Sequence, residues 1–174
     1  AHPTGYPLYL LLGKLFSMLP LGTVAWRLNL ASAVYAVAAA AVVFRIGLEL
    51  LRRPLPALLG ATALGFSPIF WSQAIVAEVY ALHALIVAVA LRMMVELTAG
   101  RRRGDSRRPT ADRRKTVVAL VFLIGLGLTN HLTTVFLIPP AALAVALRLL
   151  RDKEEGQRLV VQPIMRFLPA ALAF

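Results

Sequence analysis

Long apolar runs separated by short polar and basic segments dominate this chain. The apolar runs lie at 28–44, 55–71, 79–91, 117–128 and 132–147. Such runs, bounded by Arg and Lys, are typical of helices that cross a lipid core, where the backbone must satisfy its own hydrogen bonds. We therefore expect an all-α fold, a polytopic transmembrane helical bundle of about five to six membrane helices plus one interfacial amphipathic helix.

The first half of the chain predicts an external segment followed by three spans. In segment 1–25 we expect an amphipathic helix at 7–20 that lies in the membrane interface. Its apolar face would hold Leu8, Leu11, Leu12, Leu15 and Leu19, with Gly13, Lys14 and Ser17 opposite. In segment 26–97 we expect spans at 26–48, 55–71 and 73–97, the last two separated by a break at Pro68.

The second half predicts a basic loop at 98–115, a helical hairpin at 116–150 and the start of a truncated span at 163–174. As one helix, 116–150 would be about 52 Å long, too long for a hydrocarbon core of about 30 Å. Basic clusters on both sides of it also require an even number of crossings. A turn near Asn130 and His131 meets both conditions and is our preferred interpretation. A turn at Pro139 and Pro140 is the alternative, and it would leave Asn130 and His131 within the membrane.

The distribution of basic residues predicts one orientation. If 49–54, 98–115 and 150–162 lie inside, every Lys and Arg except Lys14 and Arg27 falls at the inner side. Segments 1–25, 68–73 and 130–131 then lie outside. Short helices anchored at the inner side would end below the outer headgroups. This geometry predicts a cavity that opens outward beneath the helix at 7–20.

Composition agrees with a membrane protein and excludes several other classes. The chain is 59% hydrophobic and 16% charged, with a mean hydropathy of +0.75. The net charge of +11 lies in loops without interleaved aromatic residues, so we expect a role in topology and no nucleic-acid partner. The absence of cysteine excludes disulfides, thiolate metal sites and cysteine nucleophiles. Its three histidines have no metal-ligand spacing, so no metal or cofactor is expected.

Polar residues at the outer side are the candidates for chemistry. A carboxylate within the membrane, such as Glu78, usually faces a cavity or a partner, and Arg27 would be a suitable partner; snorkelling toward water is the alternative. His83 shares a helical face with Tyr80 but points about 140° away from Glu78, so we expect a buried, hydrogen-bonded imidazole there. Asn130 could be an ordinary turn residue. His131 is harder to explain in that way, because the turn is recessed.

The motifs that hold these residues resemble a known family. The opening HPTGYPLYLLLGKLFSMLPLGTVAWRLNLASAV, the segment SPIFWSQAIVAEVYALHAL at 67–85 and GLGLTNHLT at 125–133 are similar to GT-C membrane glycosyltransferases. More narrowly, they resemble the family that includes the plexin-modifying protein O-mannosyltransferases and bacterial homologues. By motif, the resemblance places these residues on the reaction side: His2, Tyr6, Gln73, Glu78, Tyr80, Asn130 and His131.

The resemblance implies a transferase that moves a mannose-like sugar from a polyprenyl-phosphate donor to an acceptor on the external or lumenal face. It also implies a catalytic acid just before the HPTGYP motif, upstream of Ala1, so we expect this segment alone to be inactive. His2, Arg27 or His131 would stabilise the phosphate leaving group. A transporter or flippase is the second hypothesis, because broken helices are typical of transporters, and a non-catalytic membrane scaffold is the third. The Arg- and Ala-rich composition favours a bacterial inner membrane.

Overall fold

The computed structural model describes residues 5–98 and 110–153, and within them it contains helices and no strand. This confirms the expected all-α fold. In chain order the elements are α1 (Pro7–Ser17), α2 (Val24–Leu51), α3 (Pro54–Gly65), α4 (Pro68–Ala74), α5 (Val79–Thr98), α6 (Thr110–Leu128), the 3₁₀ helix η1 (Leu132–Leu137) and a last α-helix at 138–153.

Some of the sequence predictions concern residues outside the described ranges. They are the predicted span at 163–174, most of the predicted basic loop at 98–115, the candidate His2, and Ala1, upstream of which the catalytic acid is expected. The structure therefore does not test the position of that acid, which stays a prediction from the resemblance.

Local sequence signals set several helix boundaries. A proline occupies the first turn of α1, α3 and α4, where the missing N–H group costs no hydrogen bond. The side chain of Thr23 caps α2 by accepting from the backbone N–H of Trp26 at 3.2 Å. Helix α2 ends at Arg52, which adopts a left-handed conformation with φ of 56°. The chain then reverses, and Pro54 begins α3.

Within the described residues, three helices are long and apolar enough to cross a membrane: Val24–Leu51, Val79–Thr98 and Leu132–Lys153, the last of which includes η1. Helices α3 and α4 together pass the same test, but the pair is bent by 66°. Large apolar side chains on the bundle surface, such as Ile69 at 81% and Leu132 at 77% exposure, would face lipid. The chain is therefore an integral membrane protein.

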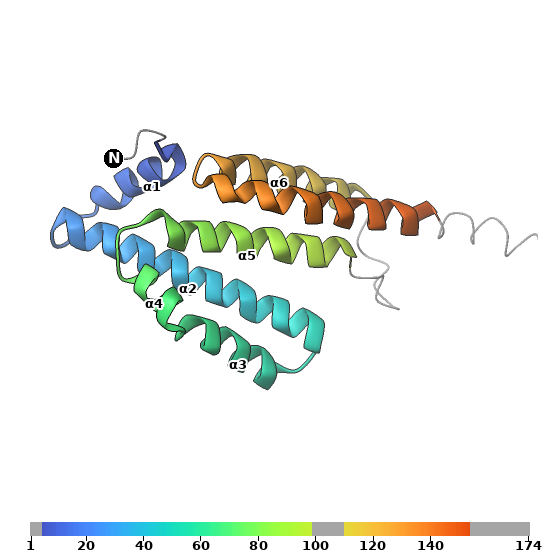
Figure 1. Ribbon diagram of the computed structural model, residues 1–174, viewed down its shortest axis with the longest axis horizontal. Coiled ribbons are helices and arrows are strands. Elements are labelled where there is room, and N and C mark those ends of the chain that lie inside the picture. The colour runs from blue at the N-terminus through green and yellow to red at the C-terminus, as the bar shows by residue number, and fades with distance from the viewer. Residues whose placement is uncertain (1–4, 99–109, 154–174) are drawn as a thin grey trace, which may run out of the picture.

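Helix α5 lies between α2 on one side and the α6 hairpin on the other, and α3 covers the far side of α2 (Figure 1). Small residues allow close approach between helices, as is common in membranes. An ideal Cβ built on Gly47 of α2 would lie 2.8 Å from the Cβ of Ala57 in α3. The chain turns at residues 129–131, as in the preferred interpretation of the sequence, while Pro139 and Pro140 lie inside the last helix.

Two groups of buried apolar side chains hold the bundle together. One joins α5 to the hairpin through Ala90, Met94, Leu120, Ile124, Leu137 and Ala141. The other joins α2 to α5 through Ala31, Tyr35, Ala36, Ala81, Leu82 and Ile86, and α1 packs against it. Because both groups include α5, this helix fixes the position of the hairpin relative to α2.

Helix α1 is present, and one residue of its predicted polar face lies against α2. Gly13, expected on the polar face, is buried against α2, where an ideal Cβ would lie 3.3 Å from Cδ2 of Leu28. Leu11 and Leu15, expected on the apolar face, are 67% and 62% exposed. Close approach to α2 selects the glycine side, and the leucines remain free to contact lipid.

The predicted third span at 73–97 is also wrong at its start. Gln73 belongs to α4, residues 75–78 are not helical, and α5 begins at Val79. Ile75 and Val76 are β-branched, which lowers their helix propensity where the chain bends. Glu78 consequently lies in the connection before α5 and not inside the predicted helix.

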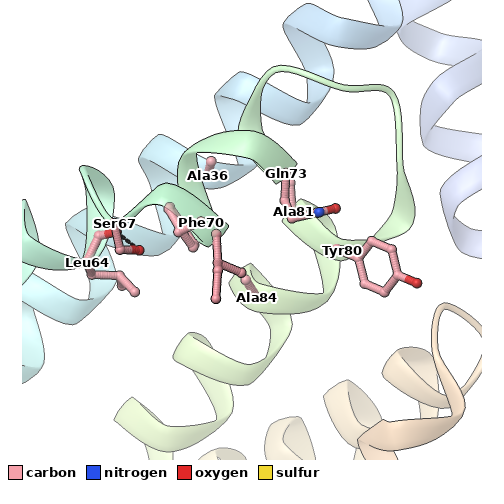
Figure 2. A pocket seen from close by; sticks show the side chains of 9 residues that line it. Ala36, Leu64, Ser67, Phe70, Gln73, Tyr80, Ala81 and Ala84 are labelled. Carbon is pink, nitrogen blue, oxygen red and sulfur yellow. Dashed lines mark hydrogen bonds between the residues drawn. The ribbon is translucent and has the colours of Figure 1, made fainter.

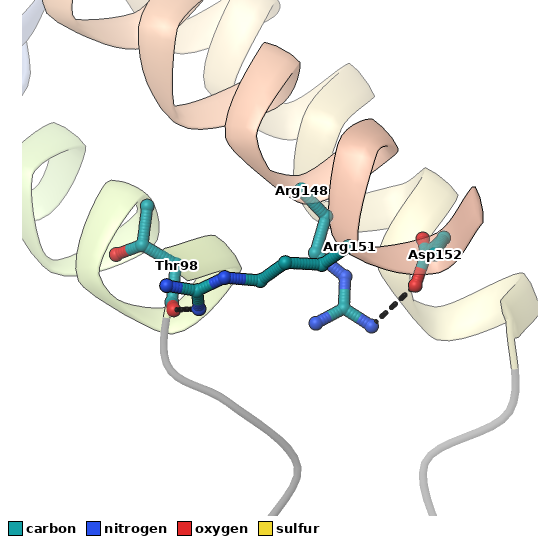
Figure 3. Close-up of polar contacts among 4 residues, drawn as sticks. All are labelled: Thr98, Arg148, Arg151 and Asp152. Carbon is teal, nitrogen blue, oxygen red and sulfur yellow. Dashed lines mark hydrogen bonds and ion pairs between the residues drawn. The ribbon is translucent and has the colours of Figure 1, made fainter. Parts of the chain in front are cut away.

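Two arginines of the last helix bind polar groups near the C-terminal ends of α5 and of the last helix itself (Figure 3). Arg151 donates from Nη1 to the carbonyl of Thr98, at the end of α5. Arg148 is buried, and its Nη2 lies 2.6 Å from Oδ1 of Asp152, one helical turn later. Carbonyls at a helix C-terminus attract cations. The contact between Arg151 and Thr98 ties the end of α5 to the last helix, whereas the pair of Arg148 and Asp152 lies within the last helix.

Candidate functional site

Three segments far apart in the sequence meet at one end of the bundle. They are the residue before α1, the first turns of α5 and the hairpin turn with η1. The imidazole of His131 lies at their meeting point. Its ring stacks on Tyr6 with a centroid separation of 6.5 Å and an interplanar angle of 7°. The rings of Tyr80 and His83 approach it to 5.6 Å and 4.9 Å.

A threonine hydroxyl bridges the two histidines. Oγ1 of Thr133 lies 2.6 Å from Nδ1 of His131 and 3.0 Å from Nε2 of His83. The backbone N–H of Thr133 also donates to Nδ1 of His131 at 3.3 Å, so this imidazole caps η1. We name Tyr6, Tyr80, His83, His131 and Thr133 the outer cluster. All five are exposed or half-buried, so a ligand can reach them.

Asn130 sits beside the outer cluster and attaches the hairpin to α5. Its side chain is fully buried, and its Nδ2 donates to the carbonyl of Val79 at 3.4 Å. The backbone N–H groups of Asn130 and His131 both donate to the carbonyl of Gly127 at 2.9 Å. Oδ1 of Asn130 is buried without a hydrogen-bond partner in the described part of the chain. Asn130 therefore positions the turn, and His131 carries the accessible polar group.

An open pocket of about 480 Å³ lies beside the outer cluster, between α2, the α3–α4 bend and α5 (Figure 2). Its lining is mainly apolar, with Ala36, Leu64, Ile69 and Phe70 prominent and with Ser67, Gln73 and Tyr80 as polar residues. Figure 2 shows Leu64 and Ser67 at one end and Gln73 and Tyr80 at the other. Tyr80 thus belongs both to the pocket and to the outer cluster.

The pocket differs from the predicted cavity in what covers it. The sequence pattern predicts that the helix at 7–20 covers the cavity, but no residue of α1 is among those that line this pocket. Helix α1 packs instead on α2, through partly buried Leu8, Tyr9, Leu12 and Phe16. The bend between α3 and α4 forms the pocket because Pro68 starts a new helix direction there.

Arg27 and Glu78 do not form the ion pair suggested as one interpretation of the sequence. The guanidinium of Arg27 donates to four carbonyls of the α1–α2 connection, those of Ser17, Leu19, Gly22 and Thr23. Arg27 thus closes the C-terminal end of α1. Glu78 is exposed and lies near Tyr9. Burial raises the pKa of Tyr9, and the negative charge of Glu78 raises it further.

Sequence reasoning missed two members of the outer cluster. His83 was expected to be a buried histidine apart from the site, because it diverges from Glu78 on a helix. The informative signal was its spacing of three residues from Tyr80, which places both on one face of α5. Thr133 gave no signal, since a threonine near a turn is ordinary. Only the hairpin geometry brings its hydroxyl between the two imidazoles.

Comparison with known proteins yields a family and two relatives. The family model described as the N-terminal domain of the protein O-mannosyl-transferase TMEM260 matches residues 1–155. The mouse protein O-mannosyl-transferase TMEM260 is 30% identical across the whole chain. A Dictyostelium discoideum protein with the same description is 31% identical over 82% of the chain.

The chain spans about a quarter of the length of the mouse relative (24%) and 18% of the Dictyostelium relative. No solved structure matches it. Both relatives are eukaryotic and so do not support the expected bacterial inner membrane. The match to the family model covers most of the chain and includes all three motifs on which the resemblance rested. The chain belongs to the family of the TMEM260 protein O-mannosyl-transferase N-terminal domain.

Proposed function

We propose that this chain is the donor-binding part of a membrane glycosyltransferase. The whole protein would transfer a mannose-like sugar from a polyprenyl-phosphate donor to an acceptor on the external or lumenal face. The observation that carries this proposal is the position of Tyr80, which contacts His131 and also lines the apolar pocket. A lipid-linked sugar has a polar head and an apolar tail, and it needs a polar and an apolar surface in contact with one another.

The chemistry of the outer cluster suits a sugar phosphate. The rings of Tyr6 and Tyr80 offer flat apolar faces with a polar edge, which is useful for stacking on a sugar ring. The imidazole of His131 offers an N–H group to a phosphate oxygen, and such hydrogen bonds gain strength when the acceptor is charged. Tyr80 is 48% exposed, so the sugar would not have to displace packed side chains.

The other residues singled out in the sequence receive different roles in this proposal. Gln73 lines the pocket beside Tyr80 and would contact the donor near its phosphate. Glu78 is exposed at the same end and would face the acceptor side. Asn130 and Arg27 would act indirectly, by holding the hairpin turn and the end of α1 in place. We assign no general base among these residues.

Transfer of labelled mannose from a lipid-linked donor, measured with the full-length protein in nanodiscs, tests the proposal. Replacing His131 by Ala should lower kcat/KM by about 100-fold, the usual loss for a charge-stabilising donor, and replacing Tyr80 by Ala should also lower it, because a stacking surface is lost. Phe136→Ala is the matched control, because Phe136 lies in η1 and is 75% exposed. It should retain the wild-type rate. Unchanged transfer by both His131→Ala and Tyr80→Ala would overturn the proposal.

A transporter or flippase is the second candidate, and the 66° bend between α3 and α4 is the observation that favours it. The two functions differ in a proteoliposome assay with a fluorescent lipid-linked sugar and no acceptor. A transferase should leave the lipid in its original leaflet, as judged by quenching with dithionite. If the fluorescence of lipid in the inner leaflet were also quenched rapidly, and only in vesicles that contain the protein, the flippase would be favoured instead.

A further inference from the structure

The histidine tautomers set the direction of the side-chain hydrogen bonds in the outer cluster, and one backbone contact indicates the tautomer of His131. The N–H group of Thr133 donates to Nδ1 of His131 at 3.3 Å, so this nitrogen carries no proton. A neutral His131 must then carry its proton on Nε2. The hydroxyl of Thr133, 2.6 Å from the same Nδ1, can only donate to it.

The direction extends to His83. The hydroxyl of Thr133 has one proton, which it uses toward His131, so it accepts from Nε2–H of His83 at 3.0 Å. Nδ1 of His83 is then an acceptor, and the hydroxyl of Thr134 lies 3.5 Å from it. The chain of donors thus starts at Thr134, passes through His83 and Thr133 and ends at Nε2–H of His131. Among residues 5–98 and 110–153, no acceptor for that last N–H group is found.

We propose that His83 and Thr133 are positioning residues that hold His131 as a hydrogen-bond donor through Nε2 and prevent it from acting as a base. This inference rests on the proposed function, because the acceptor it names is an anionic phosphate oxygen of the lipid-linked donor. A neutral imidazole with Nε2–H has no lone pair to offer at that nitrogen. The group that deprotonates the acceptor hydroxyl must therefore be another residue.

The state of the two imidazoles can be measured without any reaction. In the full-length protein labelled with ¹⁵N-histidine, difference spectra against His83→Asn and His131→Asn assign the two rings. Both should show the Nε2–H form in the wild type and in Thr133→Ser, which keeps the hydroxyl. In Thr133→Val the ring of His83 should lose this form, because it loses its acceptor. An Nδ1–H form of His131 in the wild type, or a Thr133→Val spectrum identical to that of the wild type, would overturn the inference.

Two sets of variants test the consequence for transfer. Gln places its amide N–H close to the position of Nε2, whereas Asn places it near Nδ1. His131→Gln should therefore stay within about tenfold of the wild-type kcat/KM, while His131→Asn should fall about 100-fold. Equal loss in both would show that donation from Nε2 is not the role of His131. A wild-type protein without transferase activity would refute the proposed function, whereas the imidazole spectra would still decide the hydrogen-bond direction.

Thr133→Val should lower kcat/KM about five- to tenfold, the ratio expected for one hydrogen bond, and Thr133→Ser should restore it. Thr129→Val is the matched control, because Thr129 lies in the same turn and its hydroxyl donates to the local carbonyl of Leu126 at 2.7 Å. Gel filtration should show the wild-type elution for all three variants. If the Val and Ser variants at position 133 transfer at the same rate, Thr133 does not position His131.

Discussion

Gly127 is the position at which a single methyl group should most directly disturb the candidate site. It lies in α6, one residue before the helix ends. An ideal Cβ there would lie 2.7 Å from Cγ2 of Thr134 and 2.9 Å from Cγ2 of Ile86. Carbon atoms in contact are ordinarily about 3.5–4.0 Å apart. Gly127→Ala should therefore push η1 and α5 away from α6.

The magnitude follows from comparison with a second glycine in the same helix. Gly125 is two residues earlier, and a Cβ there would meet nothing within 4 Å. Both Gly→Ala changes gain helix propensity, up to about 1 kcal/mol in a helix interior. Only Gly127→Ala adds an overpacking cost of about 1–3 kcal/mol. The difference between the two variants should therefore isolate the steric cost.

Thermal unfolding in detergent, followed by circular dichroism at 222 nm, measures that difference. Gly127→Ala should unfold at a temperature about 2–12 °C below that of Gly125→Ala, given about 2–4 °C per kcal/mol for a chain of this size. The variant should also weaken the contact between Thr134 and His83, so its mannosyl transfer should fall. Equal unfolding temperatures for the two variants would refute the packing between α6, η1 and α5 described above.

Three further predictions concern other parts of the bundle. Gly47→Ala should lower the free energy of unfolding by about 1–3 kcal/mol relative to Gly60→Ala, because Gly47 lies against the facing helix and Gly60 does not. Unfolding in mixed micelles measures both free energies, and equal values would contradict this prediction. Arg27→Lys should speed amide hydrogen exchange at residues 17–23, since an ammonium group cannot replace the planar guanidinium that binds four carbonyls. An exchange rate equal to that of the wild type would show that Arg27 does not hold this connection in place. Glu78→Gln should lower the pKa of Tyr9, because a negative charge that disfavours the phenolate is removed. A pH titration of tyrosinate absorbance at 295 nm, with Tyr9→Phe as the blank, measures this pKa. An unchanged titration midpoint would contradict the prediction.

The sequence predicted the helical architecture because its signals were long. Apolar runs and basic clusters extend over many residues, so the membrane helices and the turn near Asn130 could be located. Shorter features were less reliable. Residues 75–78 lie within an apolar stretch, and nothing in the pattern marks the end of α4 there. Glu78 was therefore assigned to a helix although it precedes α5.

Parts of the candidate site could be predicted from the side of the membrane on which residues should lie. That reasoning placed Tyr6 and His131 at one side, the resemblance added Tyr80, and the structure brings the ring of His131 close to both tyrosines. It could not identify the bridge through Thr133, because a contact between residues 50 positions apart depends on how the hairpin packs against α5. Nor could it foresee that Arg27 is occupied by carbonyls, since a charge alone does not reveal its partners.

The central claim is that the outer cluster and the basic loop lie on opposite sides of the membrane. Because this chain contains no cysteine, a single cysteine at Thr129 or at Ser106 gives an unambiguous label in a full-length protein cleared of any other cysteine. A membrane-impermeant maleimide added to sealed, oriented vesicles should label one of the two positions, and the other only after the membrane is opened with detergent. Labelling of both positions from the same side would contradict the account, because the candidate site would then share a face with the arginines of the 98–115 loop.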